Sequence, residues 1–98
     1  MNDINTELIL IRITGLDRPG LTASMTEILA RYDVTILDIG QADIHSTLSL
    51  GILFKTREDQ SGNIMKELLF EASNLGVNIR FYPISTEEYE NWVSLQGK

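Results

Sequence analysis

The sequence predicts an α+β fold, in which one antiparallel sheet carries two helices on one face. Four runs of branched apolar residues have the two-residue period of strands. Two other segments place apolar residues at the spacing of a helix stripe. Their order along the chain is β-α-β-β-α-β, the split βαβ arrangement of ferredoxin-like folds.

The first two strands are expected at residues 7–14 and 35–45. In ELILIRIT the residues Ile9, Ile11 and Ile13 share one face, and the other face is only partly polar, which predicts a central strand. The second run is interrupted by Gly40 and Ala42. Small residues in a strand suit a bulge or a close neighbour.

The third and fourth strands are expected at residues 48–55 and 77–82. Turn-compatible residues at 45–47 predict that the third strand forms a hairpin with the second. The fourth strand alternates apolar and polar residues and is expected to end at Pro83.

One helix is expected between the first and second strands and another between the third and fourth. The first carries its apolar stripe from Leu21 to Tyr32, and the second opens in the polar cluster 56–63 and ends at Gly76, which suits a left-handed stop. Residues 85–88 have the spacing of a capping box, which predicts a short additional helix. The expected organisation is therefore one domain over residues 1–84, followed by a short C-terminal helix and linker over residues 85–98.

Composition restricts the classes of function. The chain of 98 residues has a net charge of -6, no cysteine and one histidine. Disulfides, thiolate metal sites and histidine-based zinc sites are not expected, and the acidic charge would repel a nucleic-acid backbone. No run is long enough to span a membrane, and the polar first residues lack the pattern of a secretory leader, so the expected location is cytoplasmic. The expected partner is a small molecule.

The junction GLDRPG at residues 15–20 has two readings. In the first it is a helix start, with Pro19 at the first helical position and Asp17 as the cap. In the second, the backbone amides at residues 20–22 hold an anionic group and Asp17 receives an ammonium group, so that an α-amino acid binds. Arg18 either contacts a carboxylate or phosphate or lies in solvent.

Two stretches carry a resemblance to a known family. ITGLDRPGLTASMTEILA (13–30) and ILDIGQADIHSTLSLGILF (36–54) resemble ACT domains, and more closely the N-terminal ACT-type region of bacterial phosphoserine phosphatases. The resemblance covers nearly the whole chain up to Trp92. It implies a regulatory module that binds an amino acid, with serine as the first candidate. It also implies a homodimer, or pairing with a second ACT-type domain.

The resemblance also implies a binding site at the interface of neighbouring ACT units. The loop after the first strand would face the second strand of the neighbour. The residues that match these two segments are Asp17, Arg18, Gly20, Leu21 and Thr22 in the loop, and Asp38, Ile39, Gly40 and Gln41 in the strand.

No catalytic or metal-binding residues and no cofactor are expected in this chain. Phosphoserine phosphatases hold magnesium on an Asp-x-Asp motif in a separate catalytic domain, and no such motif occurs here. An alternative is an acylphosphatase-like enzyme with Arg18 cradling a phosphate, but Asn78 is not where the water-positioning asparagine would be expected. A third reading, an RNA-binding module, lacks the exposed aromatic residues that base stacking needs on the strand 7–14.

Overall fold

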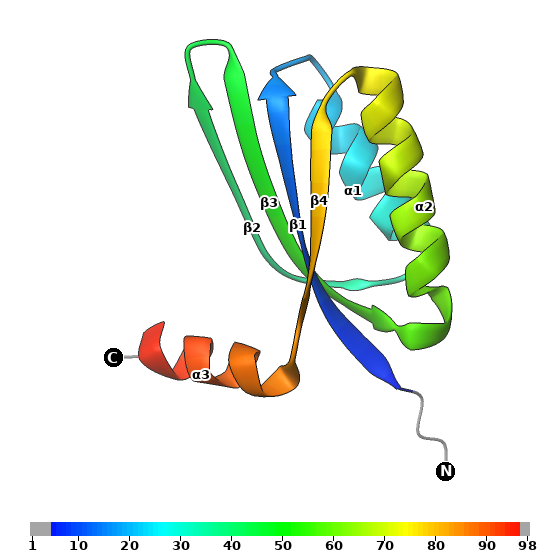
Figure 1. The fold of residues 1–98 in the computed structure, drawn as a ribbon, viewed down its shortest axis with the longest axis vertical. Coiled ribbons are helices and arrows are strands. Elements are labelled where there is room, and N and C mark those ends of the chain that lie inside the picture. Colours follow the sequence, from blue (N-terminus) through cyan, green and yellow to red (C-terminus); the bar gives the residue numbers. More distant parts are fainter. Residues whose placement is uncertain (1–4, 97–98) are drawn as a thin grey trace.

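A computed structural model describes residues 5–96 and confirms the predicted fold class (Figure 1). One four-stranded sheet is combined with two helices on one face and a third, C-terminal helix. The elements in chain order are β1 (Thr6–Leu16), α1 (Leu21–Arg31), β2 (Thr35–Ile44), β3 (Thr47–Arg57), α2 (Glu58–Leu75), β4 (Asn78–Ile84) and α3 (Thr86–Gln96).

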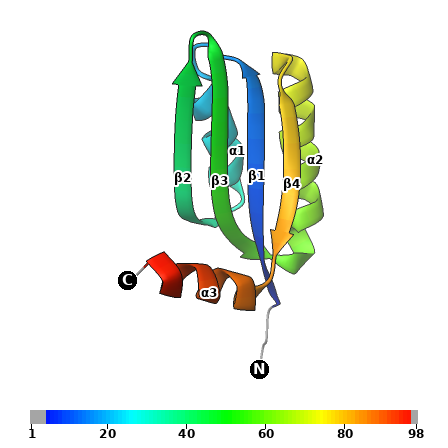
Figure 2. The same cartoon turned by 60° about the vertical axis from the view of Figure 1, so that its left-hand side comes forward.

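The sheet is antiparallel throughout, with the strand order β2-β3-β1-β4. β1 is therefore central, as its apolar faces predict, and β2 is an edge strand. α1 and α2 cover one face of this sheet, and α3 lies across its lower end (Figures 1 and 2). No helix of the described part of the chain is long and apolar enough to cross a membrane.

The core lies between the sheet and the helices α1 and α2. Ile11 pairs with Ile52 of β3 and with Phe81 of β4, and both Ile11 and Ile52 are fully buried. The helices contribute buried residues at the predicted stripe positions, among them Leu21, Met25, Ile28, Leu29, Ile64, Leu68 and Ala72. Burial of these apolar side chains is the main force that stabilises the domain.

Two details of the strands differ from expectation. β4 continues through Pro83, which pairs with Ile9, to Ile84. An edge strand accommodates this proline because one side of the strand needs no hydrogen-bond donor. In β2 the register shifts between Ile36 and Asp38, so the irregularity lies before Gly40 rather than at it.

The structure describes the predicted C-terminal segment as far as Gln96. The additional helix predicted after Pro83 is α3, which begins at Thr86. Gly97 and Lys98, at the end of the predicted linker, lie outside the described residues.

The two glycines of the junction GLDRPG are required for different reasons. A Cβ on Gly15 would lie 2.8 Å from Cγ1 of Val77, which is too close for a side chain. Gly20 has a φ of 81°, a left-handed conformation that other residues adopt only at a cost, and has open space around it. The junction is thus fixed by packing at its first glycine and by backbone conformation at its second.

Candidate functional site

The start of α1 differs from the predicted helix start. The helix begins at Leu21 with Gly20 as its N-cap, and no side chain caps it. The predictions that Pro19 is the first helical residue and that Asp17 caps the helix are therefore wrong. The amide of Leu21 donates to the carbonyl of Arg18 at 3.2 Å, so it is not open to a ligand either. The turn that Gly20 makes places Pro19 one residue ahead of the N-cap.

Asp17 instead joins the loop to the turn between β2 and β3. Its amide donates to the carbonyl of Ser46 at 2.8 Å. The neighbouring carboxyl group of Asp43, with a smaller contribution from desolvation, raises the pKa of Asp17. Two carboxylates that share a site resist ionising together. The loop therefore presents a pair of acidic groups that a positive charge would stabilise.

A second contact joins the start of α1 to β2. The hydroxyl of Thr22 donates to Oε1 of Gln41 at 3.0 Å. The side-chain nitrogen Nε2 of Gln41 donates a hydrogen bond to Oδ1 of Asp43 at 3.3 Å. Asp17, Thr22, Gln41 and Asp43 are here called the polar corner. It brings loop and strand together within one chain, whereas the resemblance placed them on neighbouring units.

Asp43 was missed by the sequence reasoning. The signal that could have found it is the two-residue period of β2, since Gln41 pairs with Leu50 and Asp43 pairs with Leu48 on the same face. Leu48 and Leu50 are buried under the helices, so Gln41 and Asp43 share the side of the sheet on which α1 begins.

The other predicted site residues lie outside the polar corner. Leu21 is buried with 1% of its surface exposed, so its side chain belongs to the core. The guanidinium of Arg18 reaches toward Gly76 at the C-terminal end of α2, where a Cβ would lie 3.8 Å from Nη2. A cation is favoured near a helix C-terminus.

The strand residues are divided between the two faces of the sheet. Asp38 and Gly40 pair with Leu53 and Gly51 and therefore share the face away from α1 and α2. Ile39 shares the face of Gln41 and is half-exposed. Asp38 accepts a hydrogen bond from the amide of Ile39 at 2.9 Å. The structure thus brings Thr22 and Gln41 together and turns Asp38 and Gly40 away from them.

Hydrogen-bond acceptors dominate the chemistry of the polar corner. Two carboxyl groups can receive an ammonium group, while the nearby start of α1 offers backbone amides and the positive end of its dipole. Within residues 5–96 no three His, Asp or Glu side chains are placed to hold a metal ion. The arrangement fits binding of a small zwitterion.

A family model described as ACT domain matches residues 7–82. The chain belongs to the ACT-domain family. This assignment confirms the resemblance stated from the two sequence stretches, and it fits the observed sheet order.

Several named proteins are similar in sequence to this ACT domain. A UPF0237 protein of Methanococcus maripaludis is 34% identical over 77 residues, which cover 74% of this chain and 83% of that protein. A UPF0237 protein of Pyrobaculum aerophilum is 28% identical over 85% of this chain and 94% of its own length. The phosphoserine phosphatase SerB2 of Mycobacterium tuberculosis is 42% identical over 45 residues, only 11% of that protein.

Solved structures share the fold at low sequence identity. An ACT domain protein from Streptococcus pneumoniae has a TM-score of 0.69 and 21% identity, over 81% of this chain and 91% of its own. A candidate transcriptional repressor of the glycine cleavage system has a TM-score of 0.77 and 18% identity. The match covers 82% of this chain and 47% of the repressor, so the ACT domain corresponds to about half of that molecule.

Proposed function

We propose that this ACT domain is a regulatory module that binds an α-amino acid at the polar corner, with serine as the first candidate. The observation that carries the proposal is the Asp17–Asp43 carboxyl pair beside the uncapped start of α1. The pair would receive the ammonium group of the ligand. The amides at the helix start other than that of Leu21 would receive its carboxylate, because the first amides of a helix lack partners within it.

We further propose that the module regulates a larger enzyme, a magnesium-dependent phosphoserine phosphatase of the cytoplasm. The 42% identity to part of SerB2 supports this proposal, although it extends over only 45 residues. In such an enzyme the catalytic residues and the magnesium would belong to another domain. The isolated ACT domain would hydrolyse neither phosphoserine nor an acyl phosphate.

Self-association through the edge strand β2 is part of the same proposal. β2 exposes Ile36, Ile39 and Ile44, the last to 70%, and an edge strand has backbone groups with no partner inside its own sheet. A second copy, or a second ACT unit of the same protein, would cover them. Sedimentation velocity of the isolated domain at high concentration is expected to show a dimer, and a single 11.0 kDa species would contradict it.

The ligand is tested with a thermal-shift panel of the twenty amino acids and phosphoserine. A ligand at 100 times its Kd stabilises the fold by about 2.7 kcal/mol. Titration calorimetry then compares the parent with Asp17→Asn, which keeps the shape of the side chain and removes its charge. The affinity is expected to fall by about 1.5–3 kcal/mol, the size of a hydrogen bond to a charged group.

Asp33→Asn is the matched control. Asp33 is exposed beyond the far end of α1 and has a φ of 58°, which asparagine tolerates. Its affinity for the ligand should equal that of the parent. Unchanged affinity in Asp17→Asn, or no binding of any amino acid at millimolar concentration, would refute the proposed site.

A further inference from the structure

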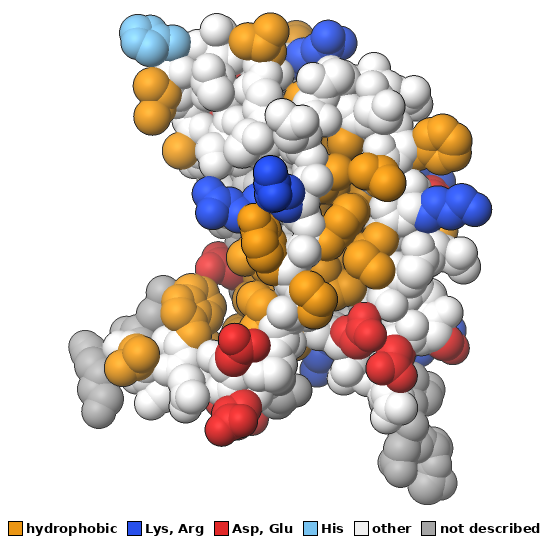
Figure 3. All heavy atoms as spheres, in the orientation of Figure 1, with side chains coloured by type: hydrophobic (Ala, Val, Ile, Leu, Met, Phe, Trp, Pro, Cys, Tyr) orange, Lys and Arg blue, Asp and Glu red, His pale blue; other side chains and the backbone are white. Residues whose placement is uncertain are grey.

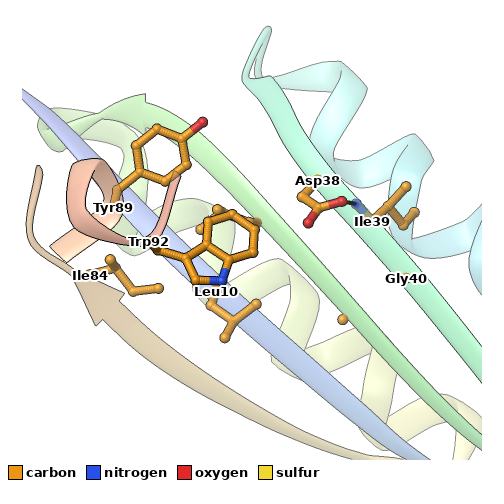
Figure 4. A pocket seen from close by; sticks show the side chains of 9 residues that line it. Leu10, Asp38, Ile39, Gly40, Ile84, Tyr89 and Trp92 are labelled. Atoms are coloured by element: carbon orange, nitrogen blue, oxygen red, sulfur yellow. Dashed lines mark hydrogen bonds between the residues drawn. The ribbon is translucent and has the colours of Figure 1, made fainter. Parts of the chain in front are cut away.

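The sheet face opposite α1 and α2 contains a hollow that the polar corner does not use. It has a volume of about 480 Å³ and opens between the strands and α3. Figure 4 shows Tyr89 and Trp92 of α3 beside Ile84 and over Leu10, with Asp38 on the far side. Binding sites for small molecules have this size and this mainly apolar, aromatic lining. We call this space, between Trp92, Leu10 and Gly51, the open-face hollow.

The open-face hollow adjoins a depression that is lined by Arg12, the strand partner of Arg80. This second depression has a volume of about 360 Å³ and shares Leu10, Gly40 and Gly51 with the open-face hollow. Arg12 pairs directly with Arg80 of β4, so both side chains stand on the same face of adjacent strands. In the space-filling view, cationic side chains gather at mid-height beside hydrophobic ones (Figure 3).

These two arginines have an unfavourable position within the chain itself. Like charges directly opposite one another on neighbouring strands destabilise a sheet. The ion pairs formed among the described residues are Arg31–Glu67 and Arg57–Asp59, so neither Arg12 nor Arg80 has a carboxylate partner there. Both are exposed, in a chain of net charge -6. A bound anion would remove the repulsion, and guanidinium groups bind carboxylate or phosphate through paired hydrogen bonds.

Asp38 makes the two ends of the open-face hollow differ in charge. Its carboxylate lies on β2, two strands away from β1, and accepts the amide of Ile39. It would repel an anion at that end, whereas Arg12 and Arg80 would attract it at the other. The apolar floor between them is formed by Leu10 and Leu53.

We propose that the open-face hollow binds a small organic anion with an apolar ring, its charged group on Arg12 and Arg80 and its ring against Trp92. Gln41 of the polar corner lines one edge of the second depression, but the proposed contacts with Arg12 and Arg80 are made on the opposite face of the sheet from Asp17 and Asp43. The site in the open-face hollow does not depend on the proposed binding of an amino acid.

Binding at this site can be followed by the fluorescence of Trp92, because it is the single tryptophan of the chain. The probes are 3-phenylpropanoate and its neutral amide, 3-phenylpropanamide, which differ mainly in charge. A saturable change in Trp92 emission is expected with the carboxylate. The amide is expected to bind about tenfold more weakly, the loss that follows from one charge-assisted hydrogen bond.

The double variant Arg12→Gln/Arg80→Gln should bind both probes equally weakly. Its thermal midpoint should not fall, because the change removes a repulsion, and an unaltered circular dichroism spectrum checks its fold. Arg31→Gln on the helix side and Asp17→Asn in the polar corner should keep the parent's preference for the carboxylate. The last variant separates this proposal from the amino-acid site.

Three outcomes would overturn the proposal. The first is equal affinity of the parent for the two probes, and the second is an unchanged preference for the carboxylate in the double variant. The third is no binding of either probe at about 10 mM, a concentration at which fragment-sized ligands of low affinity are still detected. A dimer that dissociates in the double variant, with no probe bound by the parent, would assign the arginines to a protein interface instead.

Discussion

The helices α1 and α3 begin in opposite ways. At α3 the hydroxyl of Ser85 accepts a hydrogen bond from the backbone amide of Glu88 at 3.0 Å. The carboxylate of Glu88 in turn accepts a hydrogen bond from the backbone amide of Ser85 at 2.9 Å. At α1 a left-handed Gly20 takes the cap position and no side chain serves the helix amides. The polar side chains near α1 contact β2 instead. The polar side chains at the start of α3 hydrogen-bond to the amides of the same helix start, whereas those near the start of α1 contact a strand that is distant in sequence.

The largest effect is expected from Gly20→Ala. Alanine must adopt the φ of 81° that Gly20 has, which costs about 1–2 kcal/mol. Urea unfolding should show this loss of stability. Gly62→Ala is the control, since Gly62 lies inside α2, has space for a Cβ and should gain up to about 1 kcal/mol. The same sign for both variants would contradict the backbone explanation.

A smaller effect is expected from Ser85→Ala. Loss of a capping hydroxyl costs about 1 kcal/mol, and here it acts on α3, whose residues are largely exposed. Emission of Trp92 should therefore shift toward that of a solvated indole at lower temperature than in the parent. Ser94→Ala, an exposed position within the same helix, should leave the transition unchanged. Equal behaviour of the two variants would mean that the capping box does not hold α3.

The smallest effect is expected from Asp17→Asn, and it depends on pH. Because the contact with Asp43 raises the folded pKa of Asp17 above 3.8, the folded state binds this proton more tightly than the unfolded state. The parent therefore loses stability as pH rises from 3.8 through the folded pKa. The asparagine variant lacks this loss, so its stability relative to the parent should rise over that window. Urea unfolding from about pH 3 to 7 tests it, and a constant difference would exclude the Asp17–Asp43 contact.

The fold could be predicted from the sequence because its signals are local and repeated. Branched apolar residues at a period of two mark each strand, and the apolar stripe from Leu21 marks α1. The capping box of α3 was also predictable, since Ser85 and Glu88 interact within one turn. These features need no knowledge of distant residues.

The candidate site was less predictable because it depends on contacts between distant segments. Asp17 was expected to cap the helix that follows it, but its carboxyl partner is Asp43, on a strand that comes later in the chain. The contact of Thr22 with Gln41 is equally non-local. Which face Asp38 and Gly40 occupy depends on the register shift after Ile36, and no residue pattern announces such a shift.

The central place of β1 also governs how the domain is made. Both neighbours of β1 in the sheet, β3 and β4, follow it in the chain and are therefore synthesised after it. At about 5–20 residues per second, its isoleucines wait a few seconds for their first partner strand. Pairing of segments so far apart in sequence is also slow to nucleate. The buried isoleucines of β1 therefore stay exposed to solvent and to other proteins until β3 has been synthesised.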